Sequence, residues 1–452
     1  MKVVITHTDF RLYWPSRILA LQEALEARGD ELYTIEIAGS GSPYAFSDKA
    51  GAGARPIRNW ICLFPAIRME DIPAARAFRV LLAKLHELKP DVILSGSIAY
   101  PSGATAVYWA KTNHKPVIIF DDIKPEDVPR NALVNYIKKL IYSQVDAVLC
   151  PAAPWTQAFL RWHFRREQLF FGVDVVDNGF WRKPDPKAAL PGEILAAPMR
   201  EMRETQMGEM LDTRAQRMQR CLIEGGKQSL TEGKLRMNMG GIGLSGPYFL
   251  AVGRQIPAKN FLLMLQAYAQ YRAVTEGRDC LPLVMIGEGP ERQQLEAYIK
   301  KRGINEVYLL PFVNPEVLRT FYHQAAALVL PSRSETWGLV VNEAMAAGLP
   351  VLVSRACGCA AVLVEEGVNG YTFSPNSPDQ LLEALLSFTK EDAAGRAAMG
   401  RASERLIRPW GLDQFVKGSL EAIHYAMANR KACQSMGARL VLKRWKGRYR
   451  PM

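Results

Sequence analysis

Short apolar runs alternate with amphipathic segments along the first part of the chain. Such runs predict strands at 2–6, 31–37, 91–96, 116–120 and 146–150, and 3.6-residue spacing predicts helices at 16–29 and 130–143. Strands that alternate with helices indicate βαβ units and a parallel sheet covered on both faces. The pattern therefore predicts a first Rossmann-like domain over residues 1–185.

The same alternation restarts near residue 247. It predicts strands at 248–253, 282–287, 307–312, 327–332 and 350–354, and helices at 260–274 and 291–303. We expect a second doubly wound domain over 246–412, so the fold class is α/β with two Rossmann-like domains. Domains of this kind that face each other leave a cleft at the carboxyl ends of their strands, where open parallel sheets bind ligands.

Two segments break the pattern. Residues 186–245 are charged and hold five methionines between 199 and 218, which fits either an amphipathic helix against a partner or an insertion without chemistry. The tail, 431–452, is basic and has no acidic residue. Its interleaved apolar residues suit an anionic membrane surface, although nucleic-acid binding or a simply solvated tail would also fit.

Composition narrows the class of protein. The chain is 48% hydrophobic and 23% charged with a net charge of +12, and no apolar run is long enough to span a bilayer. The N-terminus is interpreted as a first strand and not as a signal peptide. Seven scattered cysteines, of which only Cys357 and Cys359 are close together, predict packed thiols in a reducing, cytoplasmic protein and no zinc site.

Two carboxylates frame the strongest chemical signal. Glu335 lies in the loop after an apolar strand, and Glu343 lies eight residues later inside the next helix. This spacing suits two anchors on one elongated polar ligand. Between them, Trp337, Gly338 and Leu339 start the helix, where free backbone N–H groups favour phosphate. The layout fits a nucleotide sugar, with the sugar on one carboxylate and the ribose on the other.

A second loop adds positive charge. A strand ends at Gly253 and is followed by Arg254 and Lys259 before the next helix begins. Arg offers a planar fork and Lys a point charge, and both suit a diphosphate. Because the two loops follow strands of one predicted sheet, we expect them to converge on one ligand.

These motifs resemble glycosyltransferase family 4, whose members have the GT-B fold. The resemblance is carried, in order, by the Arg–Lys loop, IGEGP (286–290), PFV (311–313), the E-x7-E stretch and NGYTF (369–373). It covers 247–405 closely, and the first domain only in architecture and in elements such as 175–181.

The resemblance implies a role for each residue. Arg254 and Lys259 would neutralise the leaving diphosphate, and Glu335 would contact the donor sugar. Backbone amides of Trp337, Gly338 and Leu339 would hold sugar and phosphate, with Gly253 in the same loop cluster, and Glu343 would bind the ribose. The family retains anomeric configuration and uses neither metal nor cofactor beyond its donor, here expected to be a UDP- or GDP-linked hexose. It also implies that a last helix, 413–430, returns to the first domain.

The first domain is expected to hold the acceptor. Where the family often has a histidine after the strand at 116–120, this chain has Asp121 and Asp122, and we expect Asp122 to face the sugar. After the first strand, Arg11, Tyr13 and Arg17 offer aromatic and polar groups suited to a saccharide. Core or loop roles are equally compatible with these residues.

Other classes fit less well. A dinucleotide dehydrogenase needs G-x-G-x-x-G, and the nearest match after Gly287 lacks the third glycine. A nucleotide-sugar epimerase of the same fold and a glycogen- or starch-type synthase remain alternatives. A nucleic-acid partner would explain the tail but not the carboxylates, so none is expected. The predicted function is transfer of a hexosyl-type sugar to a saccharide or lipid-linked saccharide, at the inner membrane face if the tail binds lipid.

Overall fold

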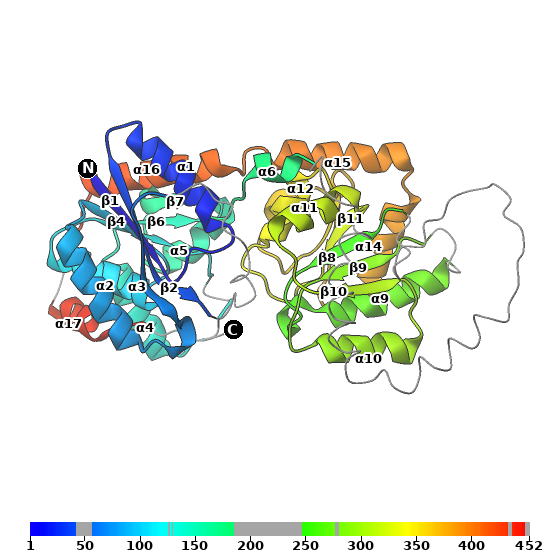
Figure 1. Cartoon of the computed structure of the whole chain (residues 1–452), viewed down its shortest axis with the longest axis horizontal. Helices are drawn as coiled ribbons and strands as arrows, with labels where there is room; N and C mark the ends of the chain where they lie inside the picture. The colour runs from blue at the N-terminus through cyan, green and yellow to red at the C-terminus, as the bar shows by residue number, and fades with distance from the viewer. Residues whose placement is uncertain are drawn as a thin grey trace, which may run out of the picture.

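The computed structural model describes residues 1–41, 57–124, 127–128, 130–184, 246–275, 280–432 and 436–447. These residues form two α/β domains that lie side by side (Figure 1). The charged segment predicted at 186–245 lies outside the described residues, and so do the last residues of the basic tail.

A parallel sheet of seven strands forms the centre of the first domain, in the order β3-β2-β1-β4-β5-β6-β7. The strands are β1 (Lys2–His7), β2 (Glu31–Ser40), β3 (Trp60–Arg68), β4 (Val92–Ser95), β5 (Val117–Phe120), β6 (Ala147–Cys150) and β7 (Leu169–Phe171). The order reverses direction between β1 and β4, which pair in register from Val3 with Val92. This is the switch point of a doubly wound sheet.

Helices cover both faces of this sheet (Figure 1). Side chains alternate along β1, so that Val3 and Ile5 join the core under α1 (Trp14–Glu26) and α16 (Leu412–Ala428), whereas Val4 joins the opposite core. That opposite face carries α2 (Ala74–Leu88), α3 (Pro101–Thr112) and α4 (Ala132–Tyr142). The short helices α5 (Thr156–Arg161) and α6 (Asn178–Arg182) follow β6 and β7.

The second domain repeats the plan with six parallel strands in the order β10-β9-β8-β11-β12-β13. They are β8 (Phe249–Val252), β9 (Leu283–Ile286), β10 (Val307–Leu310), β11 (Ala327–Leu330), β12 (Val351–Ser354) and β13 (Gly370–Phe373). The helices are α9 (Phe261–Val274), α10 (Arg292–Arg302), α11 (Pro315–Gln324), α12 (Leu339–Ala346), α13 (Ala360–Leu363), α14 (Pro378–Lys390) and α15 (Ala393–Ile407). The predicted fold class, two Rossmann-like parallel sheets, is confirmed.

The apolar pattern of the sequence did not predict three of the strands, β3, β7 and β13. β3 lies at the edge of its sheet and contains Pro65, which the pattern scores against a strand. β7 and β13 are short and only partly buried, so neither forms a clear apolar run. All three lie at sheet edges, and of the three only β7 leads to a residue of the site described below.

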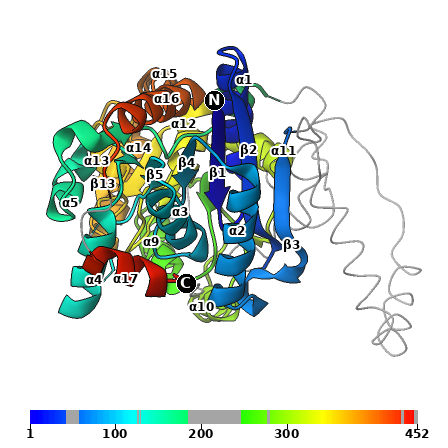
Figure 2. The ribbon, with the colours of Figure 1, turned by 90° about the vertical axis from the view of Figure 1, so that its left-hand side faces the viewer.

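The end of the chain returns to the first domain. α16 packs on α1 and on β5, β6 and β7, and α17 (Met436–Arg444) packs on α3 and α4. Figure 2 shows α17 beside α4 at the lower edge of this domain. The described part of the tail is therefore a docked helix. None of the described helices is both long and apolar enough to cross a membrane.

Candidate active site

The predicted donor loops meet at the switch point of the second sheet. β8 and β11 are neighbours in that sheet, and each ends at the same edge because the pairing is parallel. Gly253 follows β8 with a φ of 154°, and a Cβ there would lie 3.3 Å from the side chain of Lys259. Glycine thus lets the lysine fold back across the end of the strand.

Lys259 and Glu335 form the centre of the site. The Lys259 ammonium pairs with Glu335 Oε2, although the residues are 76 positions apart, and Ser332 Oγ donates to the same oxygen over 3.3 Å. Both side chains keep partial exposure, 15% and 19%. The expected convergence of the two loops is what the structure shows. The pair places a cation and a carboxylate together where solvent and ligand can reach them.

Arg254 lies in the same loop and is partly exposed. Within the part of the chain that the structure describes, its guanidinium has no hydrogen-bond or ion-pair partner, while its carbonyl accepts from Ile256 N. A cation without a protein partner beside Lys259 leaves its donors available for an anionic ligand.

The loop that carries Glu335 is braced by the CGC segment. Gly358 N donates to Glu335 O and Cys359 N donates to Trp337 O, each over 3.0 Å. Burial raises the pKa of the thiols of Cys357 and Cys359, and both cysteines are free. These cysteines therefore pack the loop, as the sequence predicts, and neither is an activated nucleophile.

Gly338 caps α12 in the left-handed region, with a φ of 109°. A Cβ at this position would lie 3.1 Å from Leu330 and 3.3 Å from the sulfur of Cys359, so glycine also allows a close approach. The helix begins at Leu339, and its first N–H groups have no acceptor in a preceding turn. A helix N-terminus thus follows directly on the loop in which Glu335 pairs with Lys259.

The Trp337 side chain is structural. It is buried, donates from Nε1 to Asn342 Oδ1 over 2.8 Å, and packs in tilted contacts against Trp155 of the first domain and Trp410 before α16. Ring centroids are 5.4 and 5.5 Å apart. The indole therefore joins the two domains. That the backbone amide of Trp337 binds the donor stays a prediction.

Glu343 is buried within the domain interface. Tyr322 donates to Glu343 Oε2 over 2.6 Å, and Tyr13 of the first domain also hydrogen-bonds this carboxyl. Burial raises the pKa of Glu343 to about 8, against the opposing effect of the two tyrosines. The structure thus bonds Glu343 to two tyrosines, and the contacts of Glu343 with ribose and of Tyr13 with acceptor stay predictions.

The two aspartates after β5 differ sharply. Asp121 accepts from Tyr142 and from Ser97 Oγ and lies 4.0 Å from Lys138, so it is tied into the first domain. Asp122 hydrogen-bonds Thr336 in the loop of Glu335. Burial and the neighbouring Asp121 raise the pKa of Asp122 to about 6. The structure therefore brings Asp122, and not Asp121, to the donor loops.

Asp174 interacts with Asp122 and Glu335, and it was not predicted as a site residue from the sequence. It follows β7, and among the described residues its buried Oδ2 has no hydrogen-bond partner. Burial, together with Asp122 and Glu335, raises its pKa to about 8, while Arg17 opposes the shift. The only signal in the sequence was its place just before the 175–181 element.

The other residues predicted to bind the acceptor, Arg11 and Arg17, form hydrogen bonds within the first domain. Arg17 is 3% exposed and donates from Nε and Nη2 to Val175 O over 2.9 and 2.7 Å. Arg11 donates to Asp9 Oδ1 and to Gly41 O. Trp14 begins α1 inside an aromatic cluster with Phe120 and Phe415. The structure does not bring Arg11, Tyr13 and Arg17 together as a set of exposed groups.

Known proteins match part of the chain. The family model of glycosyl transferases group 1 matches residues 238–406. An uncharacterized glycosyltransferase of Methanocaldococcus jannaschii is 31% identical over 146 residues, 32% of this chain and 37% of the relative. D-inositol 3-phosphate glycosyltransferase of Acidothermus cellulolyticus is 28% identical over 210 residues, 44% and 46% of the two chains. The matches span less than half of these relatives.

Solved structures match over nearly the whole chain. Anabaena HepE in complex with UDP has a TM-score of 0.64 at 15% identity, covering 94% of this chain and 100% of the other. Sucrose-phosphate synthase of Thermosynechococcus elongatus has a TM-score of 0.63 at 17% identity, covering 93% and 98%. The relatives are glycosyltransferases, so the epimerase alternative is not favoured. The chain thus has the GT-B fold of glycosyltransferases, and its residues 238–406 are similar to glycosyl transferases of group 1.

Proposed function

We propose that the protein is a retaining glycosyltransferase that moves a hexosyl-type sugar from a nucleotide-diphosphate sugar to an acceptor. The observation that carries the proposal is the pairing of Lys259 with Glu335 at the switch point, beside the start of α12. It lies inside the segment that matches the family model. HepE has been solved with UDP and with UDP-glucose, which supports a uridine nucleotide as the first donor to test.

The donor diphosphate would lie between Arg254, Lys259 and the N-terminus of α12. These groups supply positive charge where the leaving group becomes more negative, so the proposal needs no divalent ion there. On donor binding, Lys259 would form an ion pair with the phosphate, and its ion pair with Glu335 would weaken. Glu335 would then be free to accept hydrogen bonds from sugar hydroxyls.

Transfer would proceed on one face of the sugar. The acceptor hydroxyl oxygen forms the new bond to the anomeric carbon as the bond to the diphosphate breaks, and the leaving phosphate takes the hydroxyl proton. Asp122 would contact the sugar from the first domain, since its carboxyl already reaches Thr336. Closing of the domains would exclude water from the reacting centre.

The acceptor is proposed to be a saccharide or lipid-linked saccharide, bound on the first domain. Because Arg17 and Arg11 are engaged elsewhere, their predicted acceptor role would require a rearrangement. A cytoplasmic enzyme working at the inner membrane face fits the basic C-terminal segment. A glycogen- or starch-type synthase would differ in acceptor only.

A thermal-shift screen with UDP, GDP, ADP and their sugar conjugates, with and without EDTA, tests the donor site. A ligand at about 100 times its dissociation constant stabilises the folded state by roughly 2.7 kcal/mol, which is readily measured. The proposal predicts a shift with one nucleotide that EDTA leaves unchanged. A shift abolished by EDTA would contradict the metal-independent site, and no shift with any nucleotide would contradict the donor site itself.

A further inference from the structure

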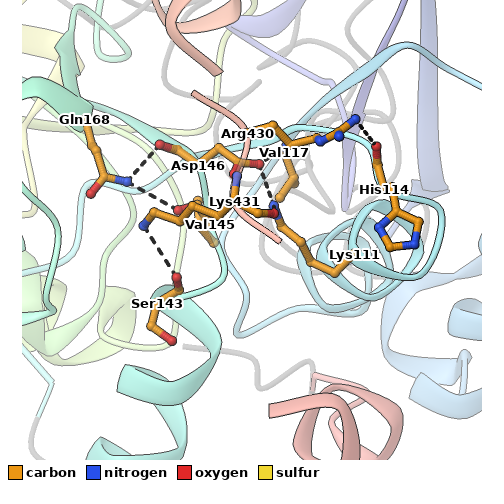
Figure 3. A network of polar contacts seen from close by, with 9 residues as sticks. All are labelled: Lys111, His114, Val117, Ser143, Val145, Asp146, Gln168, Arg430 and Lys431. Atoms are coloured by element: carbon orange, nitrogen blue, oxygen red, sulfur yellow. Dashed lines mark hydrogen bonds and ion pairs between the residues drawn. The ribbon is translucent and has the colours of Figure 1, made fainter. Parts of the chain in front are cut away.

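The segment before α17 is fixed to the first domain by a buried polar network (Figure 3). Lys111 Nζ and Asp146 Oδ2 form an ion pair of 2.6 Å with almost no exposure. Asp146 Oδ1 accepts from Lys431 N over 2.7 Å, and Arg430 donates to His114 O over the same distance. Because Lys431 N is the donor to the buried Oδ1 of Asp146, this network fixes the chain at Lys431, shortly before α17.

The segment after α17 is fixed as well. Trp445 Nε1 donates to Ile98 O over 2.7 Å, and Lys446 Nζ lies 3.5 Å from the ring centre of Phe78. Between these anchors, Ala438 and Leu442 are buried against the domain. With both ends and one face held, the orientation of the opposite face of α17 is determined.

That opposite face is basic and apolar together. Leu440 is 51% exposed, and Arg439, Lys443 and Arg444 are exposed around it at helical spacing. Within 436–447 there is no acidic residue. In the described parts of the chain, none of these three cations forms an ion pair.

The neighbouring helix α4 also exposes apolar side chains and carries basic ones. Leu133 and Tyr136 are 66% and 60% exposed, one turn apart, and Lys139 follows one turn later. No acidic residue occurs between 130 and 144. α17 packs against α3 and α4 on the side of that helix layer away from the sheet (Figures 1 and 2). We call the following exposed residues of α4 and α17, together with the partly exposed Lys139, the basic–apolar face: Leu133, Tyr136, Lys139, Arg439, Leu440, Lys443 and Arg444.

We propose that the basic–apolar face binds the surface of a bilayer that contains anionic lipids. Cations attract acidic headgroups, and exposed leucine and tyrosine side chains gain free energy when they enter the boundary between headgroups and acyl chains. A nucleic acid would engage the cations but would leave Leu133 and Leu440 in water. The partner is therefore a lipid surface, and the inference holds whichever sugar the enzyme transfers.

Co-sedimentation with vesicles tests this assignment. The vesicles are phosphatidylcholine alone or with about 30% phosphatidylglycerol, at low and at high salt. The full chain should bind the anionic vesicles at low salt at least about tenfold more tightly than the neutral ones. Charge reversal in the triple variant Arg439→Glu, Lys443→Glu, Arg444→Glu should lower this binding at least about tenfold. The double variant Leu133→Ser, Leu440→Ser should also lower it about tenfold, with less dependence on salt.

The matched control reverses three exposed cations elsewhere, Lys300→Glu, Lys301→Glu and Arg302→Glu at the end of α10. It changes net charge equally and should bind like the wild type. Wild-type protein that ignores anionic vesicles, or a control that weakens as much as the triple variant, would overturn the assignment. Tighter binding to a single-stranded oligonucleotide than to vesicles, lost in the triple variant, would also overturn it. Nucleotide-induced thermal shifts of every variant report separately on folding and on the proposed donor site.

Discussion

The loops of the second domain and the loops of the first domain meet at one site, but they use their side chains differently. After β8 and β11, Arg254 keeps its donors available, and Lys259 and Glu335 are partly exposed and pair with each other. After β1, Arg17 is buried against Val175 O and Tyr13 bonds Glu343 across the interface. The loops of the second domain therefore keep groups that a ligand can reach, whereas Arg17 is bonded within the first domain and Tyr13 bonds across the domain interface.

The largest expected effect is on the donor side. Lys259→Ala removes the charge that would stabilise the leaving diphosphate, so kcat/KM should fall at least about 100-fold. Glu335→Ala should lower kcat more than it weakens donor binding, and Arg254→Ala should lower both. Steady-state kinetics with the identified donor would measure this, with Lys300→Ala on α10 as the matched control. Activity of the Lys259 or Glu335 variant within a few-fold of wild type would contradict the assigned site.

The next effect is on the acceptor side and concerns stability. Arg17→Ala leaves Val175 O without its two charged donors in a buried place, so the free energy of unfolding should fall by about 2–3 kcal/mol. Denaturant unfolding measures it. A variant as stable as the wild type but with a raised KM for acceptor would show that Arg17 binds ligand. It would contradict the view that the loop after β1 is bonded within the protein and does not bind a ligand.

Asp122 connects the two sides, and its effect should depend on pH. With a pKa of about 6, its carboxylate is charged and accepts hydrogen bonds above that pH and is protonated below it. Wild-type kcat/KM should therefore decline as the pH falls through about 6, and Asp122→Asn should be about tenfold less active at pH 7.5 without that decline. A variant that keeps the acid decline would assign the titration to another group.

The smallest expected effect is on Asp174. Its folded pKa of about 8 lies above the value of an unfolded aspartate, so the folded state holds an extra proton between about pH 4 and 8. The free energy of unfolding should therefore fall as the pH rises from about 4 to about 8, by at most about 1.4 kcal/mol per pH unit, and should no longer change through this group above about pH 8. Asp174→Asn should flatten the decline, measured by unfolding at several pH values. An unchanged slope would show that Asp174 is not the titrating group.

Periodicity predicted the two sheets because their central strands are buried on both faces and stand out as apolar runs. It missed the edge strand β3, where a proline and partial exposure weaken the pattern. The donor loops were predictable because glycines, cations and carboxylates at fixed spacing follow adjacent strands. Asp174 and the two tyrosines on Glu343 were not, because their roles depend on contacts between residues distant in the sequence.

A crystal structure with the nucleotide that gives the largest thermal shift would test the central claim most directly. The account predicts the diphosphate between Arg254, Lys259 and the backbone N–H groups at Gly338 and Leu339, with Lys259 drawn toward phosphate and Glu335 released toward the sugar. A nucleotide bound elsewhere, with Lys259 and Glu335 still paired only to each other, would contradict it.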